Sequence, residues 1–138
     1  MNTNFYVGQK ASFRKTITEA DIHLFGAISG DLNPLHINEV FASTAKFGSR
    51  VAHGMLTAIL ISAVIVTQLP GPGTIYLSQT LNFLKPVHAN DTICAEVEII
   101  EITKKPSRIK LLTRCINQYN ERVLEGEALV KPQSLNKV

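Results

Sequence analysis

An aspartate and a histidine lie close together in one polar stretch of the chain, SGDLNPLH, residues 29–36. Asp31 and His36 flank Asn33–Pro34, and a proline disfavours helix at the residue before it. The stretch is therefore predicted to be a bent loop that can bring a carboxylate and an imidazole together. Such a pair is suited to general acid–base catalysis on a water molecule. The alternative is a turn in which Asp31 caps a backbone amide and His36 packs near the start of a helix.

A glycine stands where the most apolar segment of the chain begins, directly before MLTAILISAVIVTQL, residues 55–69. The first amides of a helix have no intrahelical acceptor and lie at the positive end of the helix dipole. Gly54 would let an oxygen that gains negative charge approach these donors; a tight loop-to-helix junction is the alternative. His53 is expected to be a loop residue. Ser62 lies two turns into the segment, where its hydroxyl bonds the carbonyl four residues earlier or reaches the Asp31 loop.

Residues 55–69 are the natural support for such a site. The segment is apolar on every side, which in a helix indicates burial all round. It has about 15 residues, whereas a membrane span needs roughly 20, and Gln68 and Pro70 end it. The sequence therefore predicts a buried central helix, although the many Ile and Val residues also permit two buried strands.

The chain on either side supplies strands and short helices. Residues 11–17 are predicted to form a strand. Thr18–Asp21 has the pattern of a capping box that opens a helix ended by Gly30, and Asn38 is suited to cap a second short helix. After a break at residues 70–73, four extended runs follow with turns between them: residues 74–84, 92–103, 108–119 and 123–131. The predicted fold class is α+β, with antiparallel strands around one buried helix.

Composition narrows the class of protein. A chain of 138 residues, 45% apolar and 18% charged, is expected to form one domain, residues 1–138. The net charge of +3 is small and no Lys/Arg block contains interleaved aromatics, so no nucleic-acid partner is expected. The low charge suggests that part of the surface is buried in an oligomer. A basic turn contains Lys104, Lys105, Arg108 and Lys110 and is expected to be solvated; a role in binding phosphate is the alternative.

The sequence lacks the motifs of several other chemistries. It contains no GxSxG, GxGxxG or GxxxxGK[ST] pattern. The four histidines show neither HExxH nor the Cys/His spacing of zinc sites, so no zinc site is expected. Cys94 and Cys115 form no CxxC pair, and the N-terminus has no apolar signal core. A cytoplasmic protein with reduced thiols and no membrane attachment is expected.

Residues 31–56, DLNPLHINEVFASTAKFGSRVAHGML, resemble the hydratase motif of the MaoC-like family. The Asp-x-Asn-Pro-x-His core followed by Ala-His-Gly-Met is specific, and similarity continues in VGQKASF, QLPGPGTIYLSQTLNFLKPV and EGEALVKP. Within this family the chain is similar to the (R)-specific enoyl-CoA hydratases, especially the single-domain enzymes that supply polyhydroxyalkanoate monomers. The resemblance implies a hot dog fold, in which an antiparallel sheet wraps a long central helix. Asn90 and Asn38 depart from residues common in the family, but both suit their expected turn and cap.

The resemblance also implies roles for the residues above. Asp31 and His36 would hold one water, which adds to C3 of a trans-2-enoyl thioester while a proton reaches C2 from the same face. The amide of Gly54 would polarise the thioester carbonyl, with Ser62 and Asn33 in support. The walls of the acyl pocket would include Ile65, Tyr76 and Leu77. The resemblance implies no cofactor and no metal. Which of Asp31 and His36 is the base is left open.

The implied partners are an acyl-CoA substrate and a second copy of the chain, in a homodimer whose sheets join edge to edge. Two other functions remain open. One is a dehydratase that runs the same chemistry on acyl carrier protein thioesters in fatty-acid synthesis. The other is a hot dog module that binds acyl thioesters without converting them, which the presence of both Asp31 and His36 disfavours. The acyl chain length and the physiological direction are not defined by the sequence.

Overall fold

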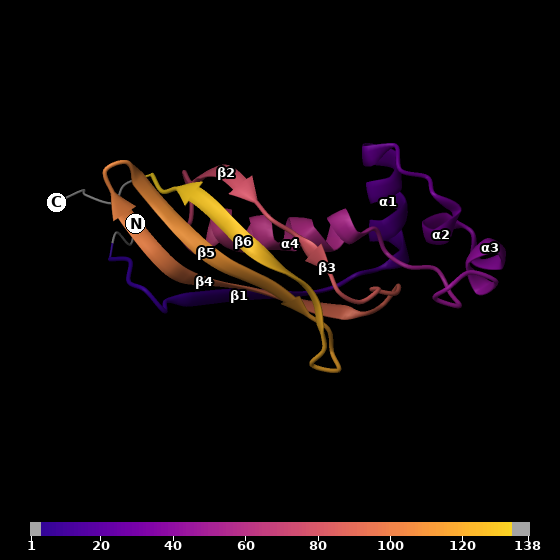
Figure 1. Cartoon of the computed structure of the whole chain (residues 1–138). Coiled ribbons are helices and arrows are strands. Elements are labelled where there is room, and N and C mark those ends of the chain that lie inside the picture. The colour runs from indigo at the N-terminus through magenta and orange to yellow at the C-terminus, as the bar shows by residue number, and fades with distance from the viewer. Residues whose placement is uncertain (1–3, 134–138) are drawn as a thin grey trace.

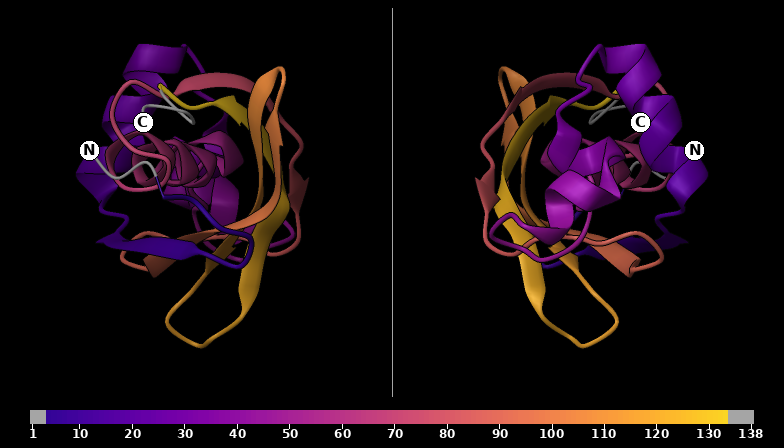
Figure 2. Two further views of the ribbon diagram at one scale, coloured as in Figure 1. Left: turned by 90° about the vertical axis from the view of Figure 1, so that its left-hand side faces the viewer. Right: turned by 90° about the vertical axis from the view of Figure 1, so that its right-hand side faces the viewer.

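A six-stranded antiparallel sheet curves around one long helix in the computed structural model, which describes residues 4–133 (Figure 1). The strand order is β1-β4-β5-β6-β2, and the short β3 also pairs with β6. Seen along the helix, the sheet wraps around it (Figure 2). The α+β class predicted from the sequence is confirmed. The elements are β1 (Lys10–Thr16), α1 (Glu19–Ser29), α2 (Pro34–Ile37), α3 (Glu39–Ser43), α4 (Gly54–Thr67), β2 (Ile75–Gln79), β3 (Asn82–Phe83), β4 (Thr92–Lys104), β5 (Ser107–Ile116) and β6 (Arg122–Lys131).

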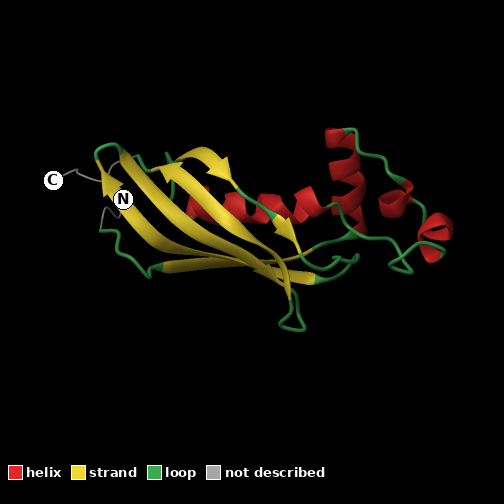
Figure 3. Ribbon diagram, viewed as in Figure 1, coloured by secondary structure: helices red, strands yellow, loops and turns green. Residues whose placement is uncertain are grey.

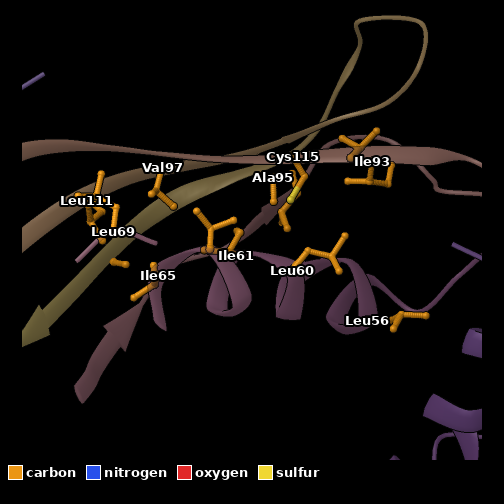
Figure 4. Packing of buried hydrophobic residues seen from close by; sticks show 14 of the residues in the cluster. Leu56, Leu60, Ile61, Ile65, Leu69, Ile93, Ala95, Val97, Leu111 and Cys115 are labelled. Carbon is orange, nitrogen blue, oxygen red and sulfur yellow. The ribbon is translucent and has the colours of Figure 1, made fainter. Parts of the chain in front are cut away.

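The central helix α4 buries one face against the concave side of the sheet (Figure 4). That face carries Leu56, Leu60, Ile61 and Ile65. Leu60 follows Leu56, and Ile65 follows Ile61, by four residues, as one side of a helix requires. Opposite them lie alternate residues of β4 and β5, namely Ile93, Ala95, Val97, Leu111 and Cys115. Each fully buried aliphatic side chain contributes about 1.5–3 kcal/mol. This packing anchors α4, and with it the position of its first residues.

The other side of α4 is not covered by the sheet. Met55 and Ile59 are exposed there, and Ser62 is half-buried one turn further along. No helix among the described residues is long and apolar enough to cross a membrane. The sequence therefore identified α4 correctly as a central helix, but this helix is buried on one face rather than all round.

The predicted capping signals are confirmed. The Thr18 hydroxyl accepts from the Asp21 amide at 3.1 Å and the Asp21 carboxylate accepts from the Thr18 amide at 2.9 Å, which completes the capping box of α1. Gly30 ends α1 with a left-handed φ of 78°. Asn38 caps α3 by accepting from the Phe41 amide at 3.0 Å.

The predicted extended run over residues 74–84 is divided into β2 and β3 in the structure. The division occurs where the Thr80 carbonyl lies directly on Gly126 of β6, so closely that a Cβ on residue 126 would overlap the carbonyl oxygen. The Thr80 amide donates to the Glu127 carbonyl at 2.9 Å, and the Thr80 hydroxyl accepts from the Glu127 amide at 2.9 Å. These bonds hold the bent segment against β6.

The segment that contains α1, α2 and α3 lies at one end of α4, beyond the edge of the sheet (Figure 3). Between Asp31 and Arg50 only Ala42 is buried. The Arg50 guanidinium pairs with Glu19 at the start of α1 and with Glu39 of α3, the latter at 2.8 Å. This polar segment therefore extends from the hydrophobic core and is held partly by charge pairs.

Candidate active site

A cavity of about 540 Å³ lies at the amino end of α4. One wall is polar and contains Asp31, His36, His53 and Gly54. The rest is mostly apolar, and residues from β3, β6 and the loops before α4 and after β3 contribute to it. These lining residues include Leu35, Phe47, Val51, Ala52, Met55, Thr57, Phe83, Leu84, Pro86, Val87, Val123 and Leu124. The cavity therefore joins the predicted acid–base pair to an apolar space beside the start of the helix.

Asp31 lies in a tight turn between α1 and α2. One carboxylate oxygen, Oδ1, accepts from the Asn33 amide at 3.2 Å, while Asn33 caps α2 by accepting from the Leu35 amide at 3.1 Å. The second oxygen, Oδ2, faces His36 at 3.9 Å from its Nε2. The turn that the sequence offered as an alternative is thus present, and it also directs the carboxylate at the imidazole. Asn33 serves the site by shaping this turn.

The proton position on His36 follows from its surroundings. Its Nδ1 lies 2.7 Å from the Val51 carbonyl oxygen, which can only accept, so Nδ1 donates. In the neutral ring Nε2 is then an unprotonated acceptor directed toward Asp31. The His36 side chain is only 12% exposed, whereas that of Asp31 is 50% exposed. The 3.9 Å between Nε2 and Oδ2 is too long for a direct hydrogen bond but lets one water bond both atoms.

His53 lies in the loop before α4, as expected, but it is also a site residue that the sequence did not predict. It is 98% buried, since only 2% of its surface is accessible. Its Nε2 donates to the Asp31 carbonyl at 2.9 Å, and its ring stacks on that of His36 with centroids 3.9 Å apart and planes 27° apart. Phe25 of α1 packs edge-on against the same ring. His53 therefore supports both members of the pair; its position next to Gly54 was the available signal.

Main-chain pairing fixes the loop that precedes α4. The Val51 amide donates to the Leu35 carbonyl at 3.1 Å, and the Ala52 amide donates to the Val87 carbonyl at 2.6 Å. Val51 also forms an isolated β-bridge with His88. The loop is thus held between α2 on one side and the segment after β3 on the other. This arrangement orients the carbonyl that sets the tautomer of His36.

Gly54 is the first residue of α4, as predicted. The amides of Leu56 and Thr57 donate to the His53 carbonyl, but no acceptor among the described residues binds the Gly54 amide. A Cβ at this position would lie 2.6 and 2.7 Å from ring atoms of Phe83, which packs over the glycine. The absence of a side chain at residue 54 therefore allows Phe83 to form part of the cavity wall beside a free N–H donor.

The other predicted site residues do not line this cavity. Ser62 lies on the half-exposed side of α4, and no hydrogen bond joins its hydroxyl to the described residues, so neither expected partner is found. Ile65 is buried in the core and Leu77 of β2 is exposed. Burial raises the pKa of Tyr76 to about 12, and its hydroxyl donates to Gln79. An acyl pocket at Ile65, Tyr76 and Leu77 stays a prediction.

One set of donor atoms in the described chain is close enough to bind a metal ion: those of Asp31, His36 and His53 lie within 4.8 Å of one another. Each imidazole already uses one nitrogen to bond a main-chain carbonyl. Because the two rings are stacked and nearly parallel, their remaining lone pairs do not converge on one point. The arrangement suits proton transfer better than chelation.

The site therefore combines a carboxylate, an imidazole with a free acceptor nitrogen, and an unpaired amide at a helix start. The model of the family described as "MaoC like domain" matches residues 4–117. The chain belongs to the MaoC-like family. The family resemblance predicted from the motif is confirmed.

Relatives in this family are similar over most of their length. An (R)-specific enoyl-CoA hydratase of Rhodospirillum rubrum is 47% identical over 123 residues, which cover 89% of this chain and 85% of the relative. A 3-hydroxybutyryl-CoA dehydratase of Methylorubrum extorquens is 47% identical and is matched over 91% of this chain and 79% of its own length. The solved (R)-hydratase of Aeromonas caviae, described as involved in PHA biosynthesis, superposes with a TM-score of 0.89 at 42% identity, covering 92% of this chain and 96% of that one. The hot dog fold is thereby confirmed.

Proposed function

We propose that this protein is an (R)-specific enoyl-CoA hydratase, which reversibly adds water to trans-2-enoyl-CoA to give (R)-3-hydroxyacyl-CoA. The observation that carries the proposal is the Asp31 carboxylate facing Nε2 of His36 across 3.9 Å, on the wall of a largely apolar cavity. The names of the relatives at 47% and 42% identity support it. A hydro-lyase acting on acyl thioesters is the class of enzyme that fits both the geometry of the site and the names of the relatives.

In the proposed reaction Asp31 and His36 act as one unit on one water. The pair takes a proton from the water as its oxygen bonds C3 of the enoyl thioester, and the electron pair of the C2–C3 double bond moves toward the carbonyl. The pair then returns one proton to C2, so that one water is added in total. General acid–base catalysis of this kind is worth about 10²–10⁴ in rate.

Gly54 has the complementary role of stabilising the charge that develops on the thioester oxygen. Its N–H has no acceptor among the described residues and lies at the positive end of α4. A donor that is already in place costs no reorganisation when the oxygen gains charge, and this favours the transition state over the substrate.

Crotonyl-CoA hydration, followed by the loss of enoyl absorbance, tests the proposal. The wild type should hydrate it, and Asp31→Asn or His36→Ala should lower kcat by at least about 10²–10⁴ with the fold retained. The double variant should be scarcely slower than either single one, because both side chains serve one water. His23→Ala, an exposed position on α1, is the matched control and should keep full activity. A wild type that binds crotonyl-CoA without converting it would instead identify a binding module.

We also propose that the working form is a homodimer. The edge strand β2 has a sheet partner on one side only, and it exposes Ile75 and Leu77. The uncovered side of α4 exposes Met55 and Ile59. A second copy that paired its sheet edge with β2 would cover apolar surface and satisfy the unpaired strand edge. The cytoplasmic location expected from the sequence stays a prediction.

Light scattering tests this assembly. The wild type should have twice the 15.2 kDa mass of one chain at micromolar concentration. Leu77→Glu should give a monomer, because it places a charge in the proposed interface, whereas Leu24→Glu on exposed α1 is the matched control and should stay dimeric. A wild-type monomer with full activity would contradict the proposal.

A further inference from the structure

Two lysines line the same cavity as the acid–base pair. Apart from Asp31 and the two histidines, Lys46 and Lys85 are the ionisable residues of its wall. Lys46 lies in the loop after α3, and Lys85 lies in the loop after β3. The two residues are 39 positions apart in sequence, and the fold brings them to one cavity.

Burial divides the cavity into an apolar interior and a charged rim. Ala52, Thr57, Val123 and Leu124 are buried and supply the interior surface. Both lysines are exposed, as are the neighbouring Phe47, Met55, Phe83 and Leu84. An acyl chain fits the interior, since burying apolar surface there is favourable. An anionic group on the same ligand would have to remain at the rim, where it keeps contact with water.

Lys46 is available to a ligand. It forms no ion pair with any described residue, and its Nζ lies 5.7 Å over the ring of Phe47, which also lines the cavity. The nearby guanidinium of Arg50, by contrast, is already paired with Glu19 and Glu39. Glu39, the carboxylate nearest to Lys46 in the sequence, is thus used by Arg50, and Lys46 has no carboxylate partner among the described residues.

Lys85 carries one ion pair and keeps further donors. Its ammonium pairs with Glu121, and its side chain is 51% exposed. Glu121 is also bonded by the Asn117 side-chain amide at 3.1 Å, which holds the carboxylate in place. An ammonium group has three N–H donors, so Lys85 can bond a second acceptor while it remains paired. The partner carboxylate restrains this lysine next to the cavity.

We propose that Lys46 and Lys85 form the binding site for the phosphate of the carrier arm of the substrate. This inference rests on the proposed function, because it takes the ligand to be a thioester of phosphopantetheine. When the acyl chain fills the apolar interior and the thioester meets Gly54, the rest of the arm leaves through the rim. Two cations there match the charge of the phosphates. CoA and acyl carrier protein both supply this arm, so both could use the site.

The test compares crotonyl-CoA with the crotonyl thioester of N-acetylcysteamine, which keeps the reacting atoms but has no phosphate. The variants are Lys46→Met, Lys85→Met and the double variant. Lys110→Met is the matched control, since Lys110 is also a lysine paired with a glutamate, Glu101, with a side chain that is 40% exposed, but it does not line the cavity. Crotonyl attached to an acyl carrier protein is the third substrate and separates the two sources of the arm.

Each lysine change should raise KM for crotonyl-CoA about 3- to 5-fold at low ionic strength, and the double change about 10-fold or more, with kcat unchanged. KM for the N-acetylcysteamine thioester should not move. Salt should raise the wild-type KM and reduce the difference between wild type and variants. If the lysine changes raise KM for crotonyl-CoA alone, the rim lysines bind phosphates that only CoA carries. If they raise KM equally for the carrier protein substrate, the lysines bind the phosphate that both substrates share.

Two results would overturn the inference. If KM for crotonyl-CoA is unchanged in the double variant, or changes as much in Lys110→Met, the rim lysines do not bind phosphate. The proposed function would still hold in that case, provided that the wild type hydrates both thioesters. If KM rises equally for the thioester without phosphate, the lysines act on the cavity rather than on the arm. A wild type that hydrates neither thioester would refute the proposed function and the phosphate site together.

Discussion

Substitutions at Gly54 can distinguish the loss of the proposed N–H donor from the steric effect of an added side chain. Gly54→Pro removes the N–H, and the structure indicates that the fold tolerates this change. The N–H has no acceptor among the described residues, position 54 is the first of α4, and His53 has φ −58° and ψ 133°, the extended conformation that a following proline requires. Losing one donor to a developing oxyanion lowers kcat by about 10²–10³.

The new Cβ is a second effect, and the structure gives its size. Alanine and proline both place a Cβ 2.6–2.7 Å from ring atoms of Phe83, roughly 1 Å inside a normal contact. The ring is 55% exposed and can turn away. An off-rotamer strain of about 0.5–1.5 kcal/mol corresponds to a loss of about 2- to 12-fold. Gly54→Ala, which keeps the N–H, should therefore lose no more than that.

The assay is steady-state hydration of crotonyl-CoA by Gly54→Ala and Gly54→Pro, each in the native and in a Phe83→Ala background. Without the ring, alanine at position 54 should lie within about 2-fold of its parent in kcat, because the contact is gone. Proline should still lose about 10²–10³. Equal kcat values for the two variants in the Phe83→Ala background would refute the donor role.

Three further changes test the supports of the site and fold. His53→Phe keeps a ring beside His36 but removes the donor to the Asp31 carbonyl, so kcat should fall about 10-fold. This loss should vanish in an Asp31→Asn background. A loss that persisted there would indicate a general destabilisation instead. Gly126→Ala should lower the free energy of unfolding by about 2–3 kcal/mol in denaturant titration, because its Cβ overlaps the Thr80 carbonyl; an unchanged midpoint would contradict this. Hydrogen bonds from Thr18 and the Lys15 ammonium lower the pKa of Asp21 in the folded protein. The ionised Asp21 carboxylate therefore stabilises the fold at pH values above its unfolded-state pKa. This stabilisation is lost as the pH falls through the lower pKa of the folded state. Asp21→Asn should therefore cost about 0.5–1 kcal/mol at pH 7 and nothing near pH 2.

Local signals in the sequence are sufficient to predict the helix caps. Thr18, Asp21, Gly30 and Asn38 act within a few residues of themselves, and each was assigned correctly because a cap depends only on nearby backbone groups. The short helix α2 was missed, since Asn33–Pro34 was interpreted only as a bend. Proline is also favourable at the first position of a helix, and Pro34 occupies that position.

The parts of the site that the sequence could not predict depend on contacts between distant segments, which form only when the sheet curves around α4. Phe83 reaches Gly54 only because β3 pairs with β6 and the chain then returns to the start of α4. Neither the stacking of His53 on His36 nor the bond to the Asp31 carbonyl has a spacing rule in sequence. For the same reason the cavity wall lies at Phe83 and Leu124, while the residues chosen from the family resemblance, Ile65, Tyr76 and Leu77, lie outside it.

Asp31 and His36 lie in a polar segment beyond the sheet, so the activity can be lost by local unfolding while the core remains folded. Because only Ala42 is buried between Asp31 and Arg50, this segment can open while the core of β4, β5 and α4 stays closed. Amide hydrogens of residues 31–50 should accordingly exchange with solvent faster than those of the core strands. Activity should also fade on warming before the sheet melts. Its decline should come earlier at high salt, which weakens the charge pairs of Arg50 that hold α1 and α3.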